Sequence, residues 1–144
     1  MIGLVTDSNS QMSPEMAEQL GIEVVPLTVS VDGTEYREGV DLDADAFYAA
    51  WADGNTPTVT TSQPAPGEFV AAYDRLAERG ATEIVSIHVT ETMSGTINAA
   101  QLAAGLVGVP ITMVDTGTAS FGVACCAWAA ADAIARGVTV DEAA

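Results

Sequence analysis

The chain contains no lysine, only one histidine and only two cysteines among its 144 residues. Its four arginines stand against 20 acidic residues, so the formal net charge is -16. Such a charge repels phosphate backbones and anionic membrane surfaces, which excludes nucleic acid as a partner. The acidity itself is typical of a solvated surface and does not indicate an activity.

Several familiar binding motifs are also missing. The sequence has no Gly-x-x-x-x-Gly-Lys loop and no Gly-x-Gly-x-x-Gly element, so nucleotide binding by those routes is unsupported. One histidine and the adjacent Cys125 and Cys126 do not suit a zinc site, and we expect neither a metal nor a cofactor. We interpret the two cysteines as small core residues of a helix, and Trp51 and Trp128 as core residues as well.

No apolar run is long enough to span a membrane, and no basic segment precedes Ile2-Gly3-Leu4-Val5. We therefore expect a cytoplasmic protein that is not integral to a membrane. Near the other end, Thr139 and Glu142 have the Thr-x-x-Glu spacing of a capping box, which opens a helix. We expect the natural protein to continue beyond residue 144.

Short runs rich in isoleucine and valine predict four strands, at 2–6, 22–31, 84–89 and 111–114. Helical patterns lie between and after them, at 16–20, 44–52, 67–78, 96–106 and 119–135. This alternation predicts a three-layer α/β/α fold with a mainly parallel sheet, and 1–144 is one domain. The stretch 32–63 departs from it, with a hairpin turn at Asp32-Gly33, and we expect an excursion beside the sheet.

Two clusters of hydroxyl side chains precede helix starts. Ser94-Gly95-Thr96 joins a β-branched run to an Ala-rich helix, where unpartnered backbone N–H groups and the helix dipole favour an anion. Thr60-Thr61-Ser62 precedes another helix start. Neither cluster has a basic residue, so a singly charged carboxylate fits better than a polyphosphate. The alternative is local: Ser94 caps its helix, and Thr61 and Ser62 end a strand in a turn.

An enzyme is the competing hypothesis. Ser94 would be the nucleophile of a small hydrolase, with His88 as its base and Asp115 to orient the ring. Alternatively, Asp7 and Asp115 would hold magnesium for phosphoryl transfer, because both follow predicted strands. Against these, His88 is typical of a satisfied core residue and Asp7 of a turn. A purely structural or interaction domain is the third possibility.

Taken together, five motifs identify a family resemblance. They are Thr6-Asp7-Ser8, Val25-Pro26-Leu27, Thr61-Ser62-Gln63-Pro64, Ser94-Gly95-Thr96 and Val114-Asp115-Thr116. In this order and spacing the chain resembles the amino-terminal part of the DegV family, bacterial fatty-acid-binding proteins that serve fatty acid kinase.

The resemblance implies a two-domain protein that holds one long-chain fatty acid between its domains. It implies that hydroxyls at Thr61 and Ser94 fix the carboxylate, with Ser62 and Gly95 beside them. It also implies no catalysis by this protein, which presents the acid to a separate kinase for acyl phosphate formation. About fifteen methylenes at about 0.8 kcal/mol each outweigh two hydroxyl contacts, so we expect the isolated amino-terminal domain to bind poorly.

Overall fold

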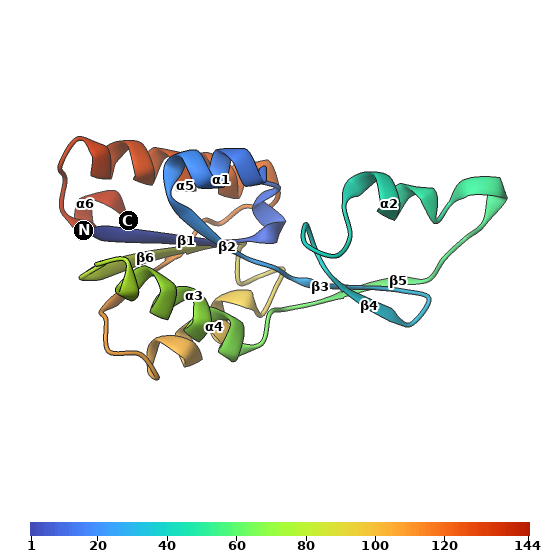
Figure 1. Ribbon diagram of the computed structural model, residues 1–144, viewed down its shortest axis with the longest axis horizontal. Helices are drawn as coiled ribbons and strands as arrows, with labels where there is room; N and C mark the ends of the chain where they lie inside the picture. The colour runs from blue at the N-terminus through green and yellow to red at the C-terminus, as the bar shows by residue number, and fades with distance from the viewer.

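A four-stranded parallel sheet forms the centre of the protein, as the computed structural model of residues 1–144 shows (Figure 1). The strand order is β2-β1-β6-β7, and the strands are β1 (Ile2–Asp7), β2 (Ile22–Val25), β6 (Glu83–His88) and β7 (Ile111–Asp115). All neighbouring pairs run parallel. The mainly parallel sheet predicted from the apolar runs is therefore confirmed.

Helices cover both faces of this sheet. One face carries α1 (Pro14–Leu20), α5 (Phe121–Ala135) and α6 (Val140–Ala143), and the other carries α3 (Pro66–Glu78) and α4 (Thr96–Ala104) (Figure 1). The predicted three-layer α/β/α architecture is thus confirmed. No helix has both the length and the apolar character that crossing a membrane requires.

Local signals explain where the helices begin. Ser13 caps α1 because its hydroxyl accepts the amide of Met16 at 3.2 Å, and Pro14 follows it at the first helical position. At α3, the side chain of Glu68 reaches back to accept the amide of Ala65 at 2.9 Å. Both helices are where the sequence predicts them, but they begin two residues earlier (α1) and one residue earlier (α3) than the predicted ranges 16–20 and 67–78.

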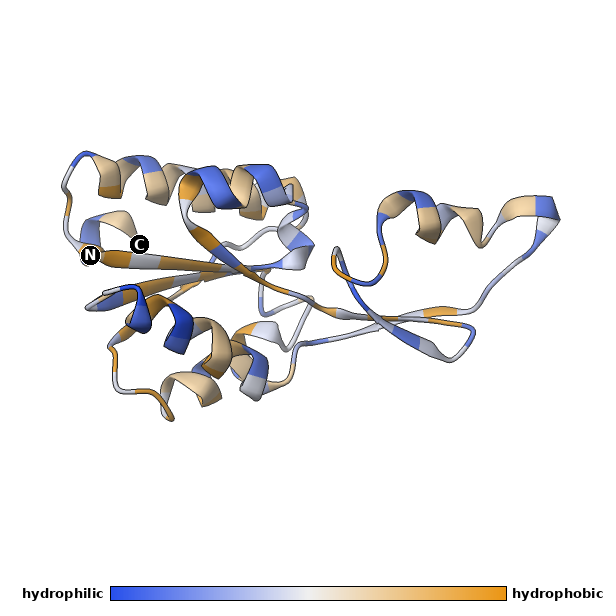
Figure 2. Cartoon of the chain, viewed as in Figure 1, coloured by the Kyte–Doolittle hydropathy of each residue, from blue (hydrophilic) through white to orange (hydrophobic).

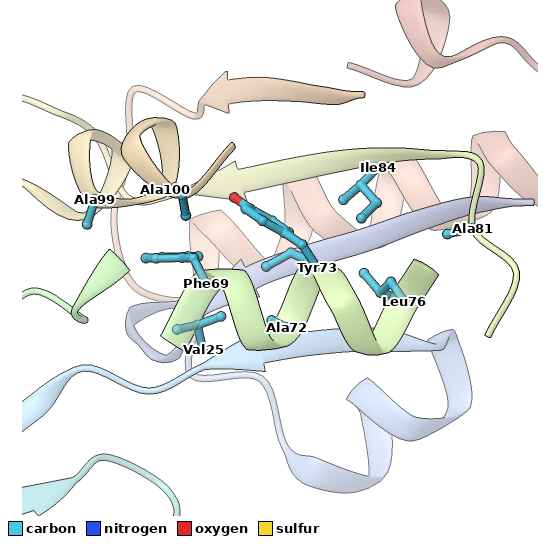
Figure 3. Close-up of a cluster of buried hydrophobic side chains, with 11 residues drawn as sticks. Val25, Phe69, Ala72, Tyr73, Leu76, Ala81, Ile84, Ala99 and Ala100 are labelled. Carbon is cyan, nitrogen blue, oxygen red and sulfur yellow. The ribbon is translucent and has the colours of Figure 1, made fainter. Parts of the chain in front are cut away.

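Alternation along the strands supplies two cores, one on each face of the sheet. Leu4 of β1 packs toward α5, whereas Val5 packs toward α3 with Phe69 and Tyr73, which are fully buried. Figure 3 shows this second core, in which Tyr73 extends from α3 toward the sheet. Figure 2 shows strongly apolar residues along the parallel strands, whereas the helices alternate apolar and polar residues.

A second, smaller sheet extends from the body and was not predicted as a sheet. It is antiparallel, in the order β4-β3-β5, with β3 (Thr28–Val31), β4 (Thr34–Arg37) and β5 (Val59–Ser62). The predicted turn at Asp32-Gly33 is confirmed, since both residues have positive φ angles of 51° and 84° between β3 and β4. We call the segment from Thr28 to Ser62 the arm (Figure 1).

The single strand predicted at 22–31 is wrong. The structure divides it into β2 and β3, which belong to different sheets. Pro26 has no amide hydrogen to donate to a strand ladder. The amide of Leu27 donates instead to the Ser8 hydroxyl, at 2.9 Å. The chain therefore leaves the parallel sheet at this point and starts the arm.

The arm also carries α2 (Ala44–Ala49), none of whose residues is buried. Phe47 and Tyr48 of α2 and Trp51, which follows it, pack on one another, with ring centroids 4.9 to 6.4 Å apart. The interpretation of Trp51 as a core residue is wrong, because it is 38% exposed.

Two interpretations of α5 are wrong for a related reason. Trp128 is 50% exposed and Cys125 is exposed, since both lie on the side of α5 that faces away from the sheet. Cys126 is half-buried and packs against the core. An Ala-rich helix gives weak periodicity, so the sequence pattern did not separate its covered side from its open side.

Candidate functional site

A cleft of about 360 Å³ lies where the arm meets the body. Thr61, Ser62, Ser94 and Gly95, the four residues expected to bind the ligand, all line it. Thr61 and Ser62 come from β5 of the arm, and Ser94 and Gly95 come from the loop between β6 and α4. The structure therefore brings together two hydroxyl clusters that stand more than thirty positions apart in the sequence.

Ser94 contributes a hydroxyl at the start of α4 without being its cap residue. Gly95 occupies the cap position and offers no side chain. The Ser94 hydroxyl accepts the amide of Thr96 at 3.2 Å and lies 2.8 Å from the Thr96 hydroxyl. The interpretation of Ser94 as the helix cap is therefore only partly correct. Ser94 is not the cap residue, but its hydroxyl oxygen accepts one amide of α4.

The start of α4 leaves donors available beside the cleft. The amides of Gly95, Ile97 and Asn98 donate no hydrogen bond within the protein. Unpartnered amides and the positive end of a helix dipole attract a negative group. The lining also contains no charged side chain, so this arrangement suits one carboxylate held by neutral donors.

Three further residues line the cleft: Leu27, Gln63 and Met93. Sequence reasoning did not assign them to the site, although each lies within or next to a quoted motif. Gln63 packs so closely on Gly95 that a β-carbon there would overlap the side-chain oxygen of Gln63. Leu27 is buried and Met93 is 71% exposed, so the cleft has an apolar floor and an apolar rim.

The catalytic arrangement considered for Ser94 is not formed. His88 is fully buried, with Nδ1 2.9 Å from the Asp7 carboxylate and Nε2 2.6 Å from the Ser86 hydroxyl. Both ring nitrogens are therefore occupied, and neither contacts Ser94. The interpretation of His88 as a satisfied core residue is confirmed, and the residue that orients its ring is Asp7 rather than Asp115.

Asp7 and Asp115 each serve nearby backbone. Asp7 is fully buried, and its two oxygens accept the amides of Asn9 at 3.0 Å and Val89 at 3.1 Å. Asp115 accepts the amides of Gly117 at 2.9 Å and Glu91 at 3.3 Å. The bond from Gly117 is the main cause that lowers the pKa of Asp115, and the bond from Glu91 adds to it. No group of three or more histidine, cysteine, aspartate or glutamate side chains is arranged to hold a metal ion.

A family model described as "Uncharacterised protein, DegV family" matches residues 1–144. The chain belongs to the DegV family. A DegV domain-containing protein from Streptomyces coelicolor is 40% identical over 142 residues, which cover 99% of this chain and 50% of that protein. The resemblance drawn from the five motifs is therefore confirmed.

Solved structures of other proteins share the fold described above. DegV from Bacillus subtilis, a fatty acid binding protein, has 33% sequence identity and a TM-score of 0.91. A stearic acid-binding protein from Eubacterium ventriosum has 28% identity and a TM-score of 0.90. Each similarity covers 99% of this chain and 50% of the other. The chain thus spans about half the length of the relatives that it matches.

Proposed function

We propose that this protein binds a long-chain fatty acid and that the cleft holds its carboxylate. In this proposal Thr61 and Ser94 donate to the two carboxylate oxygens, and Ser62 and the Gly95 amide lie beside them. The observation that carries the proposal is that both hydroxyl clusters line one cleft at the start of α4. The names of the Bacillus subtilis and Eubacterium ventriosum relatives support the choice of ligand.

We assign the cleft to the head group alone, and the chemistry of its lining supports this choice. Only Leu27 and Met93 are apolar there, and the other lining residues are polar or glycine. Burying about fifteen methylenes, at about 0.8 kcal/mol each, needs a much larger apolar surface. In the proposed function the acyl chain gains most of its affinity from a surface outside this cleft, and the cleft sets the orientation of the acid.

We further propose that the protein presents the bound carboxylate to a separate kinase and performs no catalysis itself. The kinase would transfer a phosphoryl group from ATP to a carboxylate oxygen and release ADP, which gives the acyl phosphate. The contacts of Asp7, His88 and Asp115 support this division of labour, because all three hold the protein's own structure and none contacts Ser94.

The first experiment asks whether the protein carries a lipid. The protein is purified in the longest form that its gene encodes, extracted with organic solvent, and its extract analysed by mass spectrometry. We expect about one acyl chain per protein molecule, either after purification or after incubation with palmitate or oleate. Protein that is empty after both treatments contradicts the proposal.

The second experiment tests the assignment of the carboxylate. Thr61→Ala and Ser94→Ala should each weaken palmitate binding by about tenfold, because each removes a hydrogen bond to a charged group. Thr60→Ala is the matched control, since Thr60 lies next to Thr61 on β5, is also exposed, and does not line the cleft. Equal affinity in all three variants removes Thr61 and Ser94 from the site.

A further inference from the structure

The two hydroxyls of the cleft belong to different parts of the structure. Thr61 lies on the arm, whereas Ser94 lies on a loop of the body. The chain passes between these parts only twice, at residues 26–27 and at residues 63–65. The spacing between the two hydroxyls therefore depends on how the arm is fixed at these crossings.

A closed ring of hydrogen bonds fixes the first crossing. The amide of Leu27 donates to the Ser8 hydroxyl at 2.9 Å, and that hydroxyl donates to Oε2 of Glu38 at 2.6 Å. The amide of Glu38 in turn donates to the carbonyl of Leu27 at 2.9 Å. The N–H and C=O groups of Leu27 are thus held by Ser8, which follows β1, and by Glu38, which follows β4.

Gln11 completes the surroundings of the Glu38 carboxylate. Its side-chain amide lies 3.2 Å from Oε1 of Glu38 and 3.3 Å from the carbonyl of Ser8. Hydrogen bonds to an ionised carboxylate are stronger than bonds between neutral groups, and Ser8 is only 8% exposed. The ring is therefore a firm connection between the body and the arm.

The position of this ring ties it to the cleft. Leu27 itself lines the cleft, and Val29, two residues further on, pairs with Thr61 in the arm. A displacement of Leu27 therefore carries Thr61 with it and changes the gap to Ser94. Neither Ser8 nor Glu38 lines the cleft, so any effect of these residues on the ligand acts through Leu27 and β3.

We propose that Ser8 and Glu38 are positioning residues that set the spacing between the Thr61 and Ser94 hydroxyls for one carboxylate. This inference rests on the proposed function of the cleft. It gives a role to Ser8 of the Thr6-Asp7-Ser8 motif, although Ser8 does not line the cleft. It also assigns a role to Glu38, which no motif indicated.

The test compares two ligands that share an acyl chain and differ in the head group, palmitate and hexadecanol. Only palmitate uses both hydroxyls as donors to a charge. In the full-length protein, Glu38→Ala should weaken palmitate binding by about fivefold and leave hexadecanol binding unchanged, which is a loss of selectivity rather than of fold. Ser8→Ala should give the same pattern, and combining the two substitutions should add little, because both break one ring.

Two further variants separate positioning from a general structural effect. Glu38→Gln keeps an oxygen that accepts the Ser8 hydroxyl, so it should restore most of the selectivity. Glu35→Ala is the matched control, because Glu35 is an exposed glutamate of β4 whose side chain has no hydrogen-bond partner. We expect Glu35→Ala to bind both ligands as the unmodified protein does.

The outcomes distinguish this inference from the function on which it rests. If Thr61→Ala and Ser94→Ala lose selectivity for palmitate but Glu38→Ala keeps it, only the positioning role is overturned. The positioning role is also overturned if Glu38→Ala loses affinity for both ligands equally and Glu38→Gln does not restore it. If Thr61→Ala and Ser94→Ala keep full selectivity, the carboxylate assignment fails, and the positioning role fails with it.

Discussion

The Asp7 carboxylate and the His88 ring lie 2.9 Å apart, and both side chains are fully buried. The ring continues to Ser86 at 2.6 Å, and Ser86 to the Tyr73 hydroxyl at 2.9 Å. A consistent arrangement of hydrogens runs from Tyr73 to Ser86, from Ser86 to Nε2, and from Nδ1 to Asp7. This buried chain connects α3 with β6 and β1, and it includes His88, the last residue of β6 before the loop that carries Ser94.

We predict that His88→Ala lowers the free energy of unfolding by about 3–5 kcal/mol. The substitution leaves the Asp7 carboxylate buried without its ring partner, leaves Ser86 one partner short, and opens a cavity beside Phe69, whose ring packs edge-on at 5.2 Å. Denaturant unfolding measures the change. A loss of less than about 1 kcal/mol relative to the unmodified protein contradicts a structural role for the pair.

Tyr73 predicts a dependence of stability on alkaline pH. Burial raises the pKa of Tyr73 from 10.0 to about 12, and the bond to Ser86 opposes this only in part. The folded protein thus favours the protonated phenol, so this contribution is complete below pH 10.0 and is lost as the pH rises toward 12. The slope in this window is about 1.4 kcal/mol per pH unit.

Tyr73→Phe tests this prediction directly. The variant lacks the ionisable group, so its stability should fall less steeply above pH 10 than that of the unmodified protein. At neutral pH it should lose about 1 kcal/mol, because Ser86 loses one partner. The absence of lysine helps the measurement, since no lysine titrates in the same range. Parallel stability curves above pH 10 contradict the prediction.

The sequence predicted the features that depend on local patterns. Runs of isoleucine and valine located the parallel strands, and the start of α1 near Ser13 followed from its capping serine and the proline after it. The hydroxyl clusters at Thr61 and Ser94 could be predicted as a site because each precedes a helix start. Their meeting in one cleft was an expectation of the family resemblance.

Features that depend on distant pairing could not be predicted. Asp7 and His88 stand 81 positions apart, and their contact exists only because β1 lies beside β6 in the sheet. Pro26 is a local signal against one strand at 22–31, but the bond from Leu27 to Ser8, which is 19 positions away, has no local signal. Apolar periodicity carries no information about either partner, so both relationships came from the three-dimensional structure alone.

Glu23 offers a test of how the scarce positive charges are used. Its carboxylate binds Arg75 at 2.8 Å and also binds Arg79, and these ion pairs join β2 to α3. The Glu23 side chain is only 16% exposed. Glu23→Gln should lower stability by about 1 kcal/mol at low salt, and the difference should shrink in concentrated salt. Glu83→Gln is the control, because Glu83 is exposed and unpaired. Equal effects of the two substitutions on unfolding contradict the prediction.

Gly95→Ala tests whether close packing at the start of α4 shapes the cleft. A β-carbon at this position overlaps the side-chain oxygen of Gln63, which can move because it ends a flexible side chain. We therefore expect the free energy of unfolding to change little. The displaced side-chain amide of Gln63 should disturb the lining of the cleft and weaken palmitate binding by about fivefold.

Two variants make the Gly95 result interpretable. Gly67→Ala, in the first turn of α3, is the matched control because a β-carbon there meets nothing within 4 Å, and it should leave binding unchanged. Gln63→Ala removes the side chain that a β-carbon at position 95 would overlap. In the Gln63→Ala background, Gly95→Ala should therefore cause little further loss of palmitate affinity. If Gly95→Ala binds palmitate as the unmodified protein does, the prediction is wrong. The contact between Gln63 and Gly95 then has no effect on how the cleft binds the carboxylate.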